Sequence, residues 1–262
     1  MECQVVLIRG LWVSIGLPML VSVYLPPVGL DIWAHLMAGE SYPDAADTMA
    51  LLLDKLKIDQ VSLVSISGGG PPAYQLAIRH PDRIKTLVAI DSIALKTAMP
   101  ADFNYLSNTL YFSSLGQIIM GYMARKYPKM VLRELIKDNS FLTKEEIAEQ
   151  VNIALNDPMQ LGKMMRIVRS MGNFGQRKAG VMNDIKQFTK MADTSFEKVQ
   201  CPSLVVHGTH DNLLFYQAVK ARDNIQKSQS LWVNKGSHFC SWIHPESASV
   251  QQQIITYLTE HS

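Results

Sequence analysis

The sequence predicts an α/β protein: a mostly parallel β-sheet flanked by helices, with a helical segment inserted into it. Short, β-branched and almost continuously apolar runs recur along the chain. Helical patterns lie between or after them, and the alternation stops for about 110 residues after Asp91 before it resumes near Cys201. Strands without polar alternation are typical of a parallel sheet that is covered on both faces.

The strands and helices of the sheet follow from these patterns. We expect strands at Gln4–Ile8, Val61–Ile66, Ile84–Ile90, Ser203–His207 and Leu231–Val233. Helical periodicity predicts helices at Asp44–Leu56, Ala73–Arg79 and Ser247–Tyr257. Residues 1–92 and 200–262 therefore form the predicted core.

The inserted segment, residues 93–199, has helical periodicity at Leu115–Lys126, Met130–Lys137, Lys144–Leu155 and Leu161–Val168. It holds ten of the fourteen methionines of the chain. Methionine suits irregular apolar surfaces, so the segment is interpreted either as a lid over a hydrophobic pocket or as an ordinary helical core. Both interpretations stay open at this point.

Composition excludes several classes of protein. The chain has 262 residues, of which 47% are hydrophobic and 18% charged, so it is neither disordered nor a small disulfide scaffold. Its formal charge is +2 and no stretch concentrates Lys and Arg, so nucleic acid is not an expected partner. Cys3, Cys201 and Cys240 form no C-x-x-C motif, and we expect a reducing, cytoplasmic location.

The uncharged stretch Gly10–Leu30 admits a different interpretation, a signal peptide. Glu2 stands in the region that would have to be basic, and Pro18, Pro26 and Pro27 would break a membrane-spanning helix. Buried sheet and loop is the preferred interpretation, and no membrane association is expected.

The most informative segment is the small-residue turn after the strand Val61–Ile66, where Ser67 precedes Gly68, Gly69 and Gly70. A serine between a strand and a helix projects its hydroxyl outward, next to backbone N–H groups that favour negative charge. An ordinary βα loop or a phosphate cradle is the alternative, but a P-loop Lys-Ser/Thr and a G-x-G-x-x-G are both absent from the sequence. Ser67 is therefore a candidate nucleophile.

This turn resembles the nucleophile elbow, G-x-S-x-G, of the α/β-hydrolase fold family. Ser65 replaces the first glycine, while Ser67, Gly68 and Gly69 match. The resemblance extends over residues 61–92 and 201–260, through the segments Leu76–Asp91, Pro202–Asp211 and Lys235–Phe239. It implies an α/β-hydrolase fold whose inserted segment is a cap.

The resemblance also implies a triad in the chain order nucleophile, acid, base: Ser67, Asp211 and His238. A serine needs a neighbouring base to take its proton, and a histidine suits that task near neutral pH. Asp211 would orient the histidine. Asp91, at the end of another strand, is an alternative acid.

Other roles for these residues stay open. His238 could be a solvated loop residue, and Asp211 could cap a turn. The histidines His207, His210 and His238 could form a metal cluster with Asp211. We expect neither a metal nor an organic cofactor.

An acyl-transfer site needs two N–H donors for the developing oxyanion, and Gly68 supplies one by position. The strand Val5–Gly10 resembles the family strand that precedes the second donor, with Arg9 in place of histidine, so Leu11 is the expected donor. Because the family's first two strands have no counterpart, the chain resembles an N-terminally shortened member. Two hypotheses follow from this: the site is catalytically impaired, or the recorded start lies inside a longer natural chain.

The expected function is that of a serine hydrolase acting on a small to medium carboxylic ester, with a small acyl compound as its partner and Met120, Met164 and Phe174 shaping the acyl pocket. The serine at the elbow disfavours the epoxide hydrolase and haloalkane dehalogenase branches. A thioesterase, carbon–carbon bond hydrolase, cofactor-free peroxidase or aminopeptidase is an alternative on the same fold. The aminopeptidase would need a lid carboxylate, for which Glu145, Glu146 and Glu149 are available. A non-catalytic ligand-binding protein is the alternative from a different class.

Overall fold

The computed structural model describes residues 5–10, 19–23, 41–97, 113–170, 183–184, 186–212 and 215–261. The strands are β1 (Val5–Gly10), β2 (Met19–Val23), β3 (Val61–Ile66), β4 (Ile84–Ile90), β5 (Ser203–Gly208) and β6 (Ser228–Val233). The α-helices are α2 (Tyr42–Lys55), α3 (Gly70–Arg79), α5 (Ser114–Lys126), α6 (Pro128–Lys137), α7 (Lys144–Asn156), α8 (Pro158–Ser170), α10 (Phe215–Asn224) and α11 (Ser247–Glu260). Short 3₁₀ turns are η1 (Ser67–Gly69), η2 (Pro81–Arg83) and η3 (Phe196–Lys198).

The strands form one sheet in the order β2-β1-β3-β4-β5-β6. Five of them run parallel, and β2 pairs antiparallel with β1. The mostly parallel sheet confirms the predicted fold class. The carboxyl ends of the parallel strands therefore lie at one edge of the sheet, where α/β proteins place their functional loops.

Two hydrophobic clusters cover the two faces of the central strands. On β3, Val61 and Leu63 pack in one cluster, with α2, α3 and Ile225, whereas Val64 and Ile66 pack in the other, with α11. The alternation follows from the period of two along a strand. Burial on both faces explains why these strands lack polar alternation in the sequence, since every residue of β3 and of β5 is buried.

The sheet differs from the prediction at its two edges. The strand β2 lies within the stretch that was assigned to sheet and loop, without a strand of its own. The strand β6 begins at Ser228, three residues before the predicted start at Leu231. As an edge strand it has one open side, and its first three residues are polar and either partly buried or exposed, so they carry no apolar signal.

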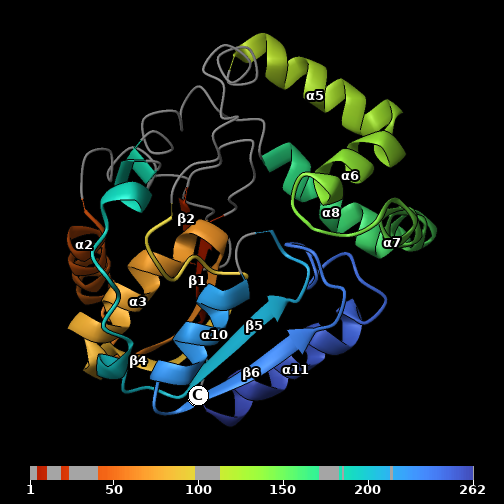
Figure 1. The fold of residues 1–262 in the computed structure, drawn as a ribbon. Helices are drawn as coiled ribbons and strands as arrows, with labels where there is room; N and C mark the ends of the chain where they lie inside the picture. The colour runs from red at the N-terminus through yellow and green to blue at the C-terminus, as the bar shows by residue number, and fades with distance from the viewer. Residues whose placement is uncertain are drawn as a thin grey trace.

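Between β4 and β5 lie the helices α5 to α8, which have a hydrophobic cluster of their own. That cluster also contains Phe239 and Ile243, from the segment that follows β6. In Figure 1 these helices lie on the side toward which the arrows of β5 and β6 point. The helices thus stand close to the edge where the loops after the strands meet.

Among the described residues, no helix is both long and apolar enough to cross a membrane.

Candidate active site

Four polar side chains named by the sequence analysis lie at the carboxyl edge of the sheet. Ser67 follows β3 directly and Asp91 follows β4 directly. Asp211 lies three residues beyond β5, and His238 lies in the segment after β6. Because these strands are neighbours and parallel, residues far apart in the sequence meet at one place.

The turn at Ser67 is tight and strained. Ser67 has a φ of 54°, in the left-handed region that side chains other than glycine rarely adopt. The chain passes from β3 into η1 and then into α3, so the turn joins a strand to a helix as the elbow resemblance implies. The carbonyl of Ser67 accepts a hydrogen bond of 2.9 Å from the N–H of Ile93, which connects the turn to the segment after β4.

Space at this turn is limited behind the serine. A Cβ atom on Gly70 would lie 2.1 Å from the carbonyl oxygen of Ile93, so only glycine fits where the turn enters α3. Packing therefore requires the glycine at position 70, the last of the three that follow Ser67.

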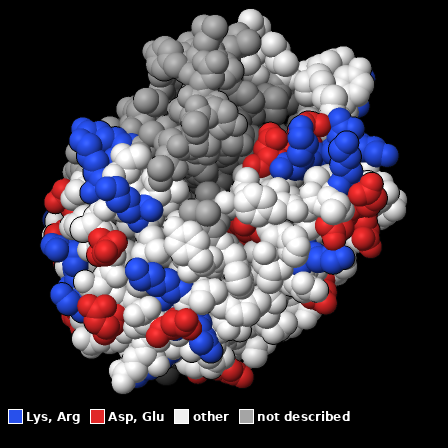
Figure 2. All heavy atoms as spheres, viewed as in Figure 1, with Lys and Arg blue, Asp and Glu red and all other residues white. Residues whose placement is uncertain are grey.

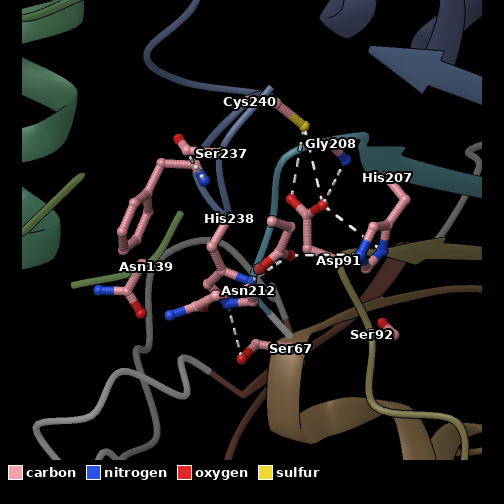
Figure 3. Close-up of polar contacts among 12 residues, drawn as sticks. Ser67, Asp91, Ser92, Asn139, His207, Gly208, Asn212, Ser237, His238 and Cys240 are labelled. Atoms are coloured by element: carbon pink, nitrogen blue, oxygen red, sulfur yellow. Dashed lines mark hydrogen bonds and ion pairs between the residues drawn. The ribbon is translucent and has the colours of Figure 1, made fainter. Parts of the chain in front are cut away.

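His238 lies between Ser67 and Asp211. Its Nε2 is 2.9 Å from the Oγ of Ser67, and its Nδ1 is 2.7 Å from Oδ2 of Asp211. Figure 3 shows the imidazole of His238 pointing toward Ser67. All three residues are buried, with exposed fractions of 0% for Ser67 and 1% for His238 and Asp211. The structure thus brings the three predicted residues into one chain of polar contacts.

The pKa of His238 lies above the ordinary value of 6.5. Burial alone would lower this pKa, but the charge of Asp211 and the hydrogen bond to Asp211 raise it. A histidine that gains basicity from a buried carboxylate is suited to accept a proton from a neighbouring hydroxyl.

Asp91, the alternative acid, has different neighbours. It is fully buried, with a φ of 43°, and its Oδ1 accepts a hydrogen bond of 3.0 Å from the N–H of Gly208. The Sγ of Cys240 lies 3.5 Å from its other oxygen. Burial, and then the charge of Asp211, raise the pKa of Asp91 well above its usual range. The geometry favours Asp211 as the partner of His238.

A cluster of three buried polar side chains includes Asp211 and lies on the side of it away from His238. The structure brings together Asp91, His207 and Asp211, whose donor atoms lie within 4.8 Å of one another, in the set of residues it describes. This differs from the cluster considered from the sequence, because His210 instead contacts the hydroxyl of Thr209 through its Nδ1. A cation at the three residues would compete with His238 for Oδ2 of Asp211.

Two glycines bring the loops of Asp211 and His238 together. A Cβ atom on Gly208, the last residue of β5, would lie 2.4 Å from the carbonyl oxygen of Gly236. One on Gly236 would lie 2.9 Å from the Cα of Gly208. The N–H of His210 donates to the carbonyl of Gly236 at 2.9 Å. Sequence reasoning gave Gly208 no role, although a glycine directly after a buried strand signals a close approach of backbones.

The turn between α6 and α7 also holds these loops. The carbonyl of Asn139 accepts from the N–H of His238 at 3.2 Å, and the N–H of Phe141 donates to the carbonyl of His210 at 2.8 Å. The Nδ2 of Asn212 donates to the carbonyl of Asp138 at 2.7 Å. These residues were missed because no short-range motif marks a contact between segments 70 to 100 residues apart.

Of the remaining predicted site residues, the structure describes Gly68 and Met164 in full. Gly68 follows Ser67 in η1, at the start of the turn that leads into α3. Leu11 and Phe174 lie outside the described residues, as does the side chain of Met120. Met164 is fully buried within the cluster of α5 to α8, which favours the core interpretation for this methionine.

The three glutamates considered for an aminopeptidase lie in α7, at the surface. Glu145 and Glu149 are exposed, and Glu146 pairs with Lys235 at 2.8 Å while capping α7. On the face shown in Figure 2, acidic and basic side chains are interspersed. In this structure the carboxylates that an aminopeptidase would need form part of an ordinary charged surface.

Comparison with known proteins agrees with this architecture. The chain is 22% identical over 225 residues to an uncharacterized hydrolase, YcgS, of Bacillus subtilis, which covers 84% of this chain and 76% of that protein. Among solved structures it is similar to an alpha/beta hydrolase fold protein from Nakamurella multipartita, with 28% identity, a TM-score of 0.77 and coverage of 83% and 75%. A thermophilic esterase from Thermogutta terrifontis matches with 15% identity, a TM-score of 0.56 and coverage of 100% and 92%.

A family model for the alpha/beta hydrolase fold matches residues 32–245. The matched range spans the elbow after β3, the helices between β4 and β5, and both loops that meet at His238. With a sheet of the predicted kind beneath them, these features agree with the match, and the chain belongs to the α/β-hydrolase fold family.

Proposed function

We propose that the protein is a serine hydrolase that cleaves a small to medium carboxylic ester through an acyl-enzyme. The observation that carries the proposal is the chain of contacts from Ser67 through His238 to Asp211, at 2.9 Å and 2.7 Å. This geometry supports the proposed roles: Ser67 as nucleophile, His238 as a base within reach of its hydroxyl, and Asp211 as the carboxylate that orients the base.

The reaction follows from this geometry. Nε2 of His238 takes the proton of Ser67 while Oγ attacks the ester carbonyl, and Asp211 stabilises the imidazolium that forms. The N–H groups of Gly68 and Leu11 are the proposed donors to the oxyanion. His238 then returns the proton to the leaving alcohol, and the same base activates the water that releases the acid.

The wider setting of the proposal is consistent with this chemistry. The Thermogutta protein, which has a similar fold, is described as an esterase, and this supports an ester as the substrate class. Buried free Cys201 and Cys240 suit a reducing compartment, and we place the protein in the cytoplasm. The proposed reaction needs neither a metal nor an organic cofactor.

Labelling by a fluorophosphonate tests the proposal without knowledge of the substrate. We expect the purified protein to be phosphonylated at Ser67, with release of fluoride, and the Ser67→Ala variant to remain unlabelled. Ser92→Ala is a matched control, because Ser92 is also buried and its hydroxyl lies 2.9 Å from that of Ser65 instead of His238. Absence of labelling in folded wild-type protein would favour a non-catalytic ligand-binding protein.

A further inference from the structure

His207 lies behind the proposed acid, at the end of β5. Its side chain is 1% exposed and its ring packs beside that of Phe215, with 5.9 Å between the centroids. Nε2 lies 3.3 Å from Oδ2 of Asp211, and Nδ1 lies 3.6 Å from Oδ1 of Asp91. Neither nitrogen makes a hydrogen bond of conventional geometry, although both are buried. Figure 3 shows the His207 ring beside Asp91.

A buried polar ring between two carboxylates needs a defined arrangement of protons. Burial lowers the pKa of His207 to about 4, so the ring is neutral at pH 7 and carries one N–H. The charge of Asp211 is compensated by the 2.7 Å contact with His238. Burial, and then the charge of Asp211, raise the pKa of Asp91 well above its usual range, which favours its protonated form.

These charges select one tautomer. If the proton of His207 were on Nδ1, the lone pair of Nε2 would face the carboxylate of Asp211, which is repulsive. With the proton on Nε2, the N–H faces the anion at 3.3 Å, and the lone pair of Nδ1 faces the carboxyl group of Asp91 at 3.6 Å. One proton on each of His207 and Asp91 therefore makes both contacts electrostatically favourable.

We propose that His207 is a positioning residue of the active site, whose Nε2–H faces the carboxylate of Asp211 while the carboxyl group of Asp91 lies against Nδ1 on the other side of the ring. The inference rests on the proposed function, because Asp211 matters only as the acid of Ser67 and His238. The contact shares the negative charge of Asp211 and holds its orientation. Through Asp211, it limits how strongly His238 retains a proton.

Among the described residues, the titratable groups that face His207 come from three elements next to β5. Asp91 comes from the end of β4, Asp211 from the loop after β5, and His238 and Cys240 from the segment after β6. From α10 the contacting ring is that of Phe215, which does not titrate. The Cys240 thiol has a pKa raised well above its usual value by burial, so it adds no charge.

Two variants separate the hydrogen-bonding role of His207 from its volume. His207→Leu fills the site without a donor, whereas His207→Gln places an amide N–H near the position of Nε2. We expect His207→Leu to lower kcat/KM for a p-nitrophenyl ester by about 10-fold or more, as for the loss of a hydrogen bond to a charged group. It also moves the acid limb of the pH profile to higher pH, because the less stabilised Asp211 holds the His238 proton more strongly. His207→Gln restores most of both.

Two outcomes of this comparison overturn the inference. Equal pH profiles in wild type and His207→Leu would show that the donor has no influence on His238. Equal effects of the Leu and Gln variants would show that only the shape of the imidazole matters.

Nitrogen-15 NMR of labelled histidine gives a readout that does not depend on turnover. We expect His207 of the wild-type protein at pH 7 to be neutral with its proton on Nε2, and a protonated ring or a proton on Nδ1 overturns the inference even if no variant folds. Absence of fluorophosphonate labelling together with the Nε2–H tautomer and a shifted His238 titration in His207→Leu would remove the proposed function alone. Normal labelling with the other tautomer would remove the inference alone.

Discussion

At the scale of single residues, two aspartates compete for one role. Both lie at the same edge of the sheet. Oδ2 of Asp211 lies 2.7 Å from Nδ1 of His238, whereas Oδ1 of Asp91 accepts a hydrogen bond from the N–H of Gly208. A triad acid acts by fixing the tautomer of the histidine and stabilising its charge, so contact with the imidazole decides the role.

Replacing each carboxylate by an amide tests this assignment. We expect Asp211→Asn to lower kcat by about 10³- to 10⁴-fold, because the amide favours the wrong tautomer of His238. Asp91→Asn should lower it by less than about 10-fold, since the neutral amide keeps the acceptor for Gly208. Steady-state hydrolysis of a p-nitrophenyl ester measures both. Loss of turnover in Asp91→Asn with Asp211→Asn unaffected would reverse the assignment.

The pH profile reports the proton of His238. The imidazole must be neutral to accept from Ser67, so activity rises as pH increases through its pKa. Because the charge of Asp211 and the hydrogen bond to it hold that pKa above 6.5, we expect the midpoint of the acid limb of kcat/KM above pH 6.5. Initial rates across pH 5 to 9 give this midpoint. A midpoint at or below 6.5 would contradict the expected electrostatics.

At the scale of elements, the close approach of Gly208 and Gly236 fixes the loops of the acid and the base. We expect Gly208→Ala to destabilise the fold by about 1–3 kcal/mol, as for an overpacked site, because its Cβ would meet backbone atoms at 2.4 Å. The same variant should react more slowly with the fluorophosphonate, because the added Cβ would displace the turn that positions Asp211. Urea unfolding and fluorophosphonate labelling measure the two effects.

Gly121, in α5, provides the matched control. A Cβ atom there would have no neighbour within 4 Å. Alanine is the better helix former, so we expect Gly121→Ala to leave labelling unchanged and to stabilise by up to about 1 kcal/mol. Equal stability of the two variants would show that the contact between the glycines carries no constraint.

At the scale of the whole molecule, the sheet between its two hydrophobic clusters determines stability. Leu87, in the central strand β4, is fully buried, whereas Leu51, on α2, is 63% exposed. We expect Leu87→Ala to cost about 2–5 kcal/mol of unfolding free energy because it leaves a cavity, and Leu51→Ala to change little. Chemical denaturation compares them. Similar losses would contradict the described packing.

The sequence predicted the central elements better than their ends. The strands β3 and β4 agree residue by residue with the expectation, because burial on both faces gives a continuous apolar run. By contrast, α6 and α8 begin at Pro128 and Pro158, two and three residues before the predicted starts. Proline suits the first turn of a helix, but it lies outside the apolar periodicity that defined the prediction.

The candidate site divides in the same way. Ser67 was recognisable because a tight turn between strand and helix requires small residues in sequence, and Asp211 and His238 followed from the resemblance. The contacts of His207, Gly208 and Asn139 depend on segments that come together only through the sheet order and the turn between α6 and α7. Apart from the glycine at the end of β5, no local pattern indicates such contacts.

By itself, the sequence determined the α/β class, the central strands and the chemical types available for catalysis, because each depends on periodicity or turn chemistry within a few residues. Only the tertiary structure decided between Asp211 and Asp91, and only it placed His207 behind the acid. That choice depends on distances of a few ångströms between loops from different strands. The packing of the whole sheet sets those distances, and neighbours in the chain do not.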